Sequence, residues 1–138
     1  MAYRQRSRGR RANGVKTIID TSALIAFLRG DPSGIAVKTL LHADEALVPA
    51  ICVYEILAGV KSERHREDRT KLLDLATIVP LDRITAQQAA TLFTKLRSSG
   101  ITLDNEDLLV AATALRLGAP ILTVNHRHFE KIPGLRLL

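Results

Sequence analysis

The 138-residue sequence has one cysteine, no tryptophan and only five aromatic residues, two tyrosines and three phenylalanines. A single thiol, Cys52, cannot form an internal disulfide, which favours a cytoplasmic protein. Cys52 lies in an apolar segment without an adjacent histidine, so we expect a core residue rather than a nucleophile. So few aromatic rings provide no extended surface on which bases could stack.

Long apolar runs are also missing. The longest uninterrupted one is residues 23–28, far shorter than the roughly 20 residues that a membrane-spanning helix needs. The N-terminal region is not followed by the apolar core and cleavage site of a signal peptide. We therefore expect a protein without a membrane segment.

Acidic residues are missing from the N-terminal end. Residues 1–16 hold six basic residues and no acid, which accounts for the whole net charge of +6, because the rest of the chain is balanced. We expect residues 1–15 to form a basic, disordered extension and residues 16–138 to form one domain. Three interpretations of the extension remain open: it binds nucleic acid, it is solvated without a role, or it is translated upstream sequence ahead of a start at Val15.

Short β-branched or apolar runs alternate with longer segments of helical periodicity, which is typical of a parallel sheet covered by helices on both faces. The pattern predicts strands over residues 17–19, 46–48, 78–79 and 121–123, and an edge strand over 135–137. It predicts helices over 22–29, 34–42, 50–61, 64–75, 86–97 and 105–117, the fifth of them capped by Thr85. The expected fold class is therefore α/β.

Two acids stand where apolar residues would be expected. Asp20 directly follows the first strand, and ligands bind at the carboxyl ends of parallel strands, although a helix N-cap would also explain this residue. Glu55 shares a helix face with Ile51, Ala58 and Gly59, and the two small residues would let this face approach the sheet closely. The alternative is that Glu55 lies at the helix rim and reaches solvent.

Further acids cluster at the start of the last long helix. Asp104 is the expected N-cap, and Glu106 fits the positive end of the helix dipole. Asp107 lies on the face that continues through Ala111 and Ala114, so it is expected to point towards the sheet.

Three inward-facing acids on separate elements would raise each other's pKa values unless a cation lies between them. Carboxylates with few histidines or thiols nearby suit Mg²⁺ or Mn²⁺. Such an ion can clamp a phosphodiester and lower the pKa of a bound water. Spacing alone leaves open whether the three acids converge.

The chain resembles the PIN-domain family, and within it the VapC-type toxins of toxin–antitoxin modules, in three motifs: IIDTSALIAFLRG, VYEILAGV and DLLVAATALRLGAPILTVNHRHFEKIPGL. The resemblance covers about residues 16–138. It implies a three-layer α/β/α sandwich with a central, mostly parallel sheet. It also implies a Mg²⁺- or Mn²⁺-dependent endoribonuclease that acts on RNA as a homodimer and is held inactive by a cognate antitoxin protein.

The resemblance assigns roles to individual residues. Asp20, Glu55 and Asp107 match the metal-binding acids of the family. Ser22 matches the hydroxyl of the DTS motif, which would orient Asp20 or a water on the ion. All four are therefore expected to be site residues.

One position departs from the family pattern. Asn125 stands where many PIN domains have aspartate, which implies a second metal site that is weak or dependent on Asp104, and a single tightly held ion. Thr123, just before it, either hydrogen-bonds an acid or water of the site or is an ordinary strand residue.

The remaining polar groups are interpreted as solvent-exposed. His126 and His128 lack a third zinc ligand at suitable spacing, so we expect a solvated loop that could touch phosphate. Residues 62–71 mix both charges at helical spacing and predict an exposed face, with arginines able to position RNA. The alternative function is a catalytically silent PIN-like module that binds RNA or an antitoxin without cutting.

Overall fold

The structure, a computed structural model, describes residues 14–138. Most of the expected N-terminal extension therefore lies outside the described residues. The strands are β1 (Thr17–Ile19), β2 (Ala46–Pro49), β3 (Thr77–Val79) and β4 (Ile121–Leu122). The helices are α1 (Thr21–Leu28), α2 (Ile35–His42), α3 (Ala50–Ala58), α4 (Glu63–Asp74), α5 (Arg83–Ser98) and α6 (Asn105–Leu117), with the short 3₁₀ turns η2 (Pro32–Gly34) and η3 (His126–His128).

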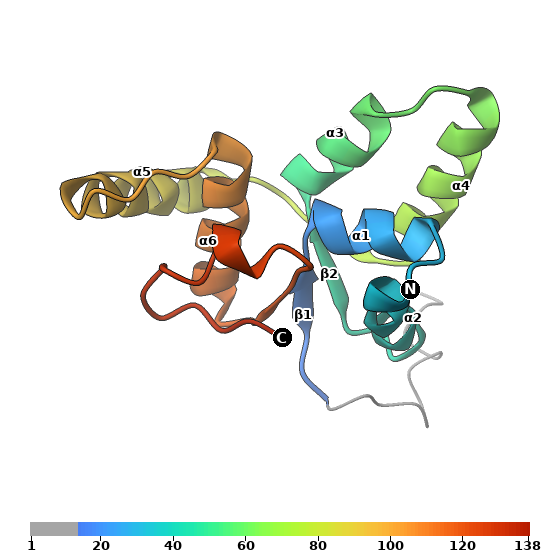
Figure 1. The fold of residues 1–138 in the computed structure, drawn as a ribbon, viewed down its shortest axis with the longest axis horizontal. Helices are drawn as coiled ribbons and strands as arrows, with labels where there is room; N and C mark the ends of the chain where they lie inside the picture. Colours follow the sequence, from blue (N-terminus) through green and yellow to red (C-terminus); the bar gives the residue numbers. More distant parts are fainter. Residues whose placement is uncertain (1–13) are drawn as a thin grey trace.

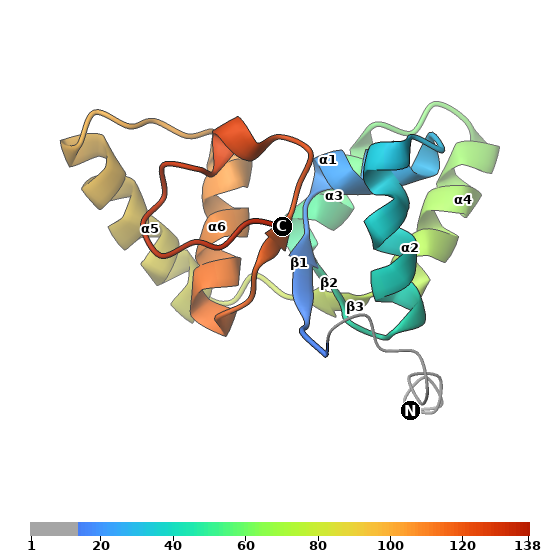
Figure 2. The same cartoon turned by 60° about the horizontal axis from the view of Figure 1, so that its bottom comes forward.

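The four strands form one parallel sheet in the order β3-β2-β1-β4. Helices α5 and α6 lie to one side of the strands, and α1, α2 and α4 lie to the other (Figures 1 and 2). This arrangement confirms the expected α/β/α sandwich. Because all strands run in the same direction, their carboxyl ends meet at one edge of the sheet, where β1 leads into Asp20.

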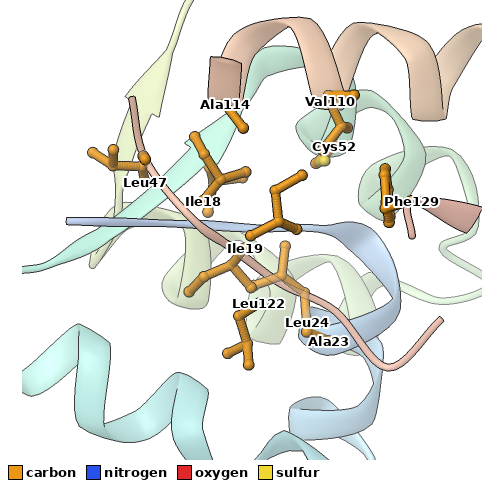
Figure 3. Packing of buried hydrophobic residues seen from close by; sticks show 14 of the residues in the cluster. Ile18, Ile19, Ala23, Leu24, Leu47, Cys52, Val110, Ala114, Leu122 and Phe129 are labelled. Atoms are coloured by element: carbon orange, nitrogen blue, oxygen red, sulfur yellow. The ribbon is translucent and has the colours of Figure 1, made fainter. Parts of the chain in front are cut away.

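The core lies between the sheet and its helices. Ile18 and Ile19 of the central strand β1 are fully buried, as the near-continuous apolar character of a parallel strand requires. They pack with Leu24 of α1 and Val110 of α6 in the same cluster (Figure 3). Cys52 is also fully buried in this cluster, which confirms the expected core role, and burial raises the pKa of its thiol to about 12.

Two helix boundaries differ from the sequence prediction by three residues, and the other helix boundaries agree with it to within one residue. Helix α5 begins at Arg83 rather than at residue 86, because Asp82 accepts a hydrogen bond from the backbone N–H of Thr85 and acts as the N-cap. Thr85 is itself buried and accepts a hydrogen bond from Arg116, so the prediction that it caps the helix is wrong. Helix α3 ends at Ala58 rather than at residue 61.

Residues 135–137 do not form the predicted fifth strand, but they lie beside β4 at the edge of the sheet, where that strand was expected. The segment runs parallel to β4, and the backbone N–H of Ile121 donates to the Arg136 carbonyl at 2.9 Å. Only one bridge forms, between Ile121 and Leu137. The preceding Gly134 adopts a positive φ of 79°, which turns the chain just before this segment and leaves little length for pairing.

Among residues 14–138, no helix combines the length and the apolar character needed to cross a membrane.

Candidate active site

Asp20 lies at the carboxyl end of β1 and is buried, with 6% of its surface exposed. Its Oδ1 accepts hydrogen bonds from the Ser22 hydroxyl at 2.7 Å and from the Ala23 backbone N–H at 3.0 Å. Its Oδ2 accepts a hydrogen bond from the Thr123 hydroxyl at 2.6 Å. Asp20 is therefore the N-cap of α1 and also a fixed carboxylate at the sheet edge, so the capping role is confirmed and the ligand-binding role stays a prediction.

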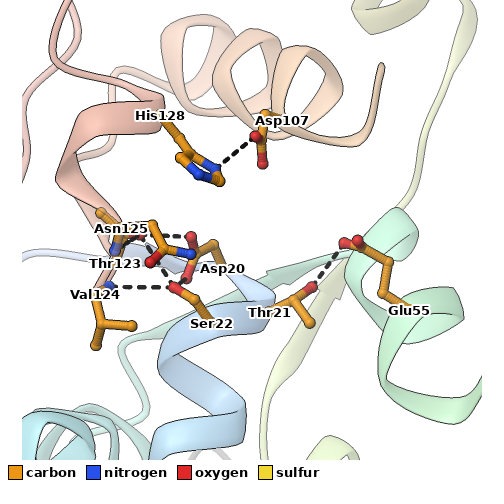
Figure 4. Close-up of polar contacts among 9 residues, drawn as sticks. All are labelled: Asp20, Thr21, Ser22, Glu55, Asp107, Thr123, Val124, Asn125 and His128. Carbon is orange, nitrogen blue, oxygen red and sulfur yellow. Dashed lines mark hydrogen bonds and ion pairs between the residues drawn. The ribbon is translucent and has the colours of Figure 1, made fainter. Parts of the chain in front are cut away.

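Ser22 and Thr123 form a small hydroxyl network around this carboxylate (Figure 4). Their oxygens lie 3.2 Å apart. The Ser22 hydroxyl accepts from the backbone N–H of Val124 at 3.2 Å, and the Thr123 hydroxyl accepts from that of Asn125 at 3.0 Å. Because each hydroxyl is held by a backbone donor, its own proton is directed towards Asp20. The interpretation of Thr123 as an ordinary strand residue is thereby excluded.

Glu55 reaches the same edge from the middle of α3. Its Oε1 accepts a hydrogen bond from the Thr21 hydroxyl at 2.7 Å, and the side chain is half-buried. Ala58 and Gly59 are exposed, so the prediction that they bring this helix close to the sheet is wrong. A Cβ built on Gly59 would meet Arg69 of α4 at 3.3 Å, so Gly59 faces that helix.

Asp107 reaches the edge from the first turn of α6, and Ala111 on the same helix face is fully buried. Its Oδ2 lies 2.8 Å from Nδ1 of His128 in η3. His128 is exposed, as expected for this loop, and it is also the partner of an acid, which the sequence did not indicate. His126 points elsewhere, with its Nε2 at 3.0 Å from the carbonyl oxygen of Leu138.

A single pocket of about 270 Å³ joins these groups. Among the residues that the structure describes, its lining contains five carboxylates and no lysine or arginine: Asp20, Glu55, Asp104, Glu106 and Asp107, together with Thr21, Ser22, Ile25, Val110, Asn125 and His128. Every acid that the sequence singled out therefore lies in one place. Asp104 occupies the N-cap position of α6, as expected, although its side chain makes no capping hydrogen bond.

The surroundings of the pocket oppose ionisation of its carboxyl groups. Burial is the main cause that raises the pKa of Glu55. Repulsion from the neighbouring acids Glu106, Asp107 and Asp20 raises it further, whereas the hydrogen bond from the Thr21 hydroxyl lowers it. Burial also raises the pKa of Asp107, with repulsion from Asp104 and Asp20, whereas His128 lowers it. A cation in the pocket would relieve this repulsion.

The donor set fits a hard divalent cation, because oxygen atoms dominate the lining and Mg²⁺ and Mn²⁺ favour carboxylate and carbonyl oxygens. Within residues 14–138, no three His, Cys, Asp or Glu side chains already stand together as a group that could hold a metal ion. Each acid is instead turned towards its own partner: Asp20 towards Thr123, Glu55 towards Thr21, and Asp107 towards His128.

Three polar residues of the pocket, Thr21, Glu106 and His128, are not among the site residues expected from the sequence. Glu106 directly precedes Asp107, the acid expected to point towards the sheet. A stabilising role at the positive end of the helix dipole was therefore the simpler interpretation of Glu106. His128 depends on the path of the η3 turn, for which the sequence pattern gives no signal.

The PIN domain family model matches residues 17–135 of the chain. Over 128 residues the chain is 34% identical to the ribonuclease VapC of Rickettsia bellii, covering 88% of this chain and 93% of the relative. It is 32% identical to ribonuclease VapC19 of Mycobacterium tuberculosis over 122 residues, covering 86% and 96%.

Solved structures with the same fold include two toxin–antitoxin complexes. The DNA-bound VapBC from Salmonella typhimurium superposes with a TM-score of 0.80 at 22% identity, covering 90% of this chain and 97% of that one. VapBC2 from Rickettsia felis, bound to a DNA fragment from its promoter, superposes with a TM-score of 0.74 at 25% identity, covering 88% and 96%.

Proposed function

The chain belongs to the PIN domain family, and from this premise we propose that it is a divalent-metal-dependent endoribonuclease, the toxin of a toxin–antitoxin pair. The observation that carries the proposal is the convergence of Asp20, Glu55 and Asp107 on one pocket without a lysine or arginine in its described lining. The relatives named ribonuclease VapC, which align over most of their length, support RNA as the substrate.

Asp20, Glu55 and Asp107 would hold the ion. A carboxylate has roughly four lone-pair directions, and Asp20 uses three of them for hydrogen bonds, so it keeps one. Glu55 and Asp107 each have one oxygen without a hydrogen-bond or ion-pair partner in the described chain. Mg²⁺ is the expected ion and Mn²⁺ the alternative, with Asp104 available as a further ligand at the rim.

A bound divalent ion supplies Lewis acidity, which polarises the scissile phosphate and makes an attacking water more acidic. The protein positions the carboxylates that would hold the ion. Ser22 and Thr123 hold Asp20 in one orientation, and Thr21 does the same for Glu55. Asn125 adds a neutral side chain to the pocket wall, which suits contact with RNA or with a weaker second ion. The reaction is hydrolysis, in which water adds to phosphorus, the ribose oxygen leaves, and no covalent enzyme intermediate forms.

We extend the proposal to the partners of the protein. An antitoxin that covers the pocket and inserts a basic side chain would neutralise the same carboxylates that hold the ion. The VapBC complexes that share this fold support such a partner, and a homodimer is the expected toxin assembly.

The test is cleavage of total RNA and of single-stranded RNA by the purified protein with Mg²⁺, with Mn²⁺ and with excess chelator. Cleavage should require the ion and should disappear in Asp20→Asn and Asp107→Asn, while circular dichroism shows a folded domain in both. Full cleavage in both variants, or in excess chelator, contradicts the proposal. Binding of RNA without cleavage would identify a catalytically silent binding module.

A further inference from the structure

A second, larger hollow adjoins the acidic pocket. It has a volume of about 500 Å³ and is lined by residues of α1, α3 and α4 and of the loop that joins α3 to α4. Ile25 and Glu55 line both hollows, so the two adjoin where α1 and α3 meet. We call it the basic groove because the basic side chains in its lining, Arg29, Lys61, His65 and Arg69, outnumber its two acids, Glu55 and Asp68.

Three of these basic side chains are available to a ligand. Among residues 14–138, the ion pairs within 4.0 Å are Asp82 with Arg116 and Asp107 with His128, so Arg29, Lys61 and His65 have no carboxylate at that distance. All three are exposed. The groove therefore presents basic side chains that form no ion pair within 4.0 Å in the described part of the chain, beside a pocket of concentrated negative charge.

Arg69 differs from the other three. Its Nη1 donates to the backbone carbonyl of Ile56 at 2.5 Å, where α3 is about to end. This contact ties α4 to α3 and closes the far wall of the groove. Arg69 is therefore a structural residue. Arg29 and Lys61 are the basic residues whose substitution can test whether the groove binds a ligand.

We propose that the basic groove binds the backbone phosphates that neighbour the scissile phosphate, so that a single RNA strand runs from the acidic pocket past Glu55 to Arg29 and Lys61. This inference rests on the proposed function. A phosphate in the acidic pocket needs a cation to offset the carboxylates, but the next phosphates along the strand have no such ion. Basic side chains supply that charge, as in other proteins that track a single-stranded backbone through a positive groove.

An acidic segment of a protein partner is the competing occupant. RNA is favoured because the groove adjoins the pocket in which the reacting phosphate would lie, so one polyanionic strand can occupy both hollows. Lys61 and His65 are both exposed, so they can meet successive phosphates of a strand rather than one fixed carboxylate. Phosphate contacts carry no sequence information, so the groove should contribute equally to all sequences.

The experiment compares Arg29→Ala/Lys61→Ala with Arg83→Ala/Lys95→Ala, a control that removes the same charges from exposed positions on α5. Both pairs are made in the Asp20→Asn protein, and fluorescence anisotropy measures binding of fluorescein-labelled single-stranded RNAs of different sequence across a salt series. The groove variant should bind roughly tenfold more weakly on every sequence, and the slope of log affinity against log salt should fall by about 1.4, from two lost phosphate contacts. The control should bind like its parent.

The same two pairs in the active protein give a second readout. The groove variant should show a raised KM at nearly unchanged kcat. An unchanged KM and RNA affinity, with cleavage intact, overturns the groove inference and leaves the proposed function standing. Loss of affinity for a cognate antitoxin peptide without any loss for RNA also overturns it, in favour of the protein partner. Failure of the parent protein to cut RNA overturns the proposed function itself.

Discussion

The Thr123 hydroxyl donates a 2.6 Å hydrogen bond to Asp20 across 103 residues of sequence, joining the end of β4 to the end of β1. The adjacent strands make this contact possible, because Ile19 pairs with Leu122 in the parallel register. The residues that follow each strand therefore emerge side by side. Thr123 also accepts from the backbone N–H of Asn125, so one buried hydroxyl links the carboxylate to the loop that carries the rest of the site.

Thr123→Val should lower kcat/KM by about 10- to 100-fold, the usual effect of removing a partner that orients a metal ligand. The substitution keeps the shape but removes the donor to Asp20 and the acceptor for Asn125. Cleavage rates across a Mg²⁺ titration measure the effect. Thr123→Ser keeps the hydroxyl and should retain most of the activity, and parental kcat/KM in the valine variant would show that the contact has no role.

Glu55→Gln should raise the melting temperature of the metal-free protein and reduce the further increase that Mg²⁺ or Mn²⁺ produces. Burial and neighbouring acids raise the pKa of Glu55, so its charge opposes folding until a cation offsets it, and bound ligand stabilises only the folded state. Thermal melts in chelator and in a metal series measure both effects. The exposed Glu67→Gln on α4 is the control, and a parental metal response in Glu55→Gln would argue against ligation by this residue.

Gly34→Ala should destabilise the domain by about 2 to 3 kcal/mol, in the range of overpacked cores. A Cβ at Gly34 would stand 2.2 Å from the backbone nitrogen of Phe27, so α1 and the η2 turn would have to separate. Urea unfolding followed by circular dichroism measures the change. Gly59→Ala is the matched control, because its new Cβ would meet the Arg69 side chain at 3.3 Å and the Glu55 carbonyl oxygen at 3.7 Å, far less crowded than at Gly34. Equal stability in both variants would contradict the close approach at Gly34.

Asp82→Asn should lower stability at neutral pH, and the difference from the parent should shrink as the pH falls below about 3.8. The Arg116 guanidinium, followed by the Thr85 backbone N–H, holds the pKa of Asp82 well below its ordinary value of 3.8. A lowered folded-state pKa gives stability that is present above the unfolded value and is lost as the carboxylate is protonated. Melting temperatures of both proteins across this pH range test the prediction. A difference that stays constant at all pH values would contradict it.

The sequence predicted the fold class and the acids of the pocket because both follow from local signals. Parallel strands appear as short apolar runs, and an acid directly after β1 or on the inward phase of α6 is visible in the helical period. The contacts that orient these acids are different. The pairs of Thr21 with Glu55 and His128 with Asp107 each depend on two elements folded against one another, so spacing along the chain carries no information about them.

The errors have separate origins. Ala58 and Gly59 share a helical face with Glu55, but that side of α3 meets α4 through Arg69 rather than the sheet. Residues 135–137 have a strand-like composition, yet the turn at Gly134 allows only one bridge to β4. The first error comes from the element that packs against α3, and the second from the turn just before the segment.

The most direct test of the central claim, that carboxylates of this pocket hold a divalent ion for RNA hydrolysis, is the mapping of RNA ends. Total RNA is sequenced after brief induction of the protein, with the Asp20→Asn protein as the control. The account predicts new ends at defined positions that the control lacks, without 2′,3′-cyclic phosphates, because water rather than the neighbouring 2′-hydroxyl attacks phosphorus. Identical ends in both samples, or cyclic phosphates at the new ends, would contradict it.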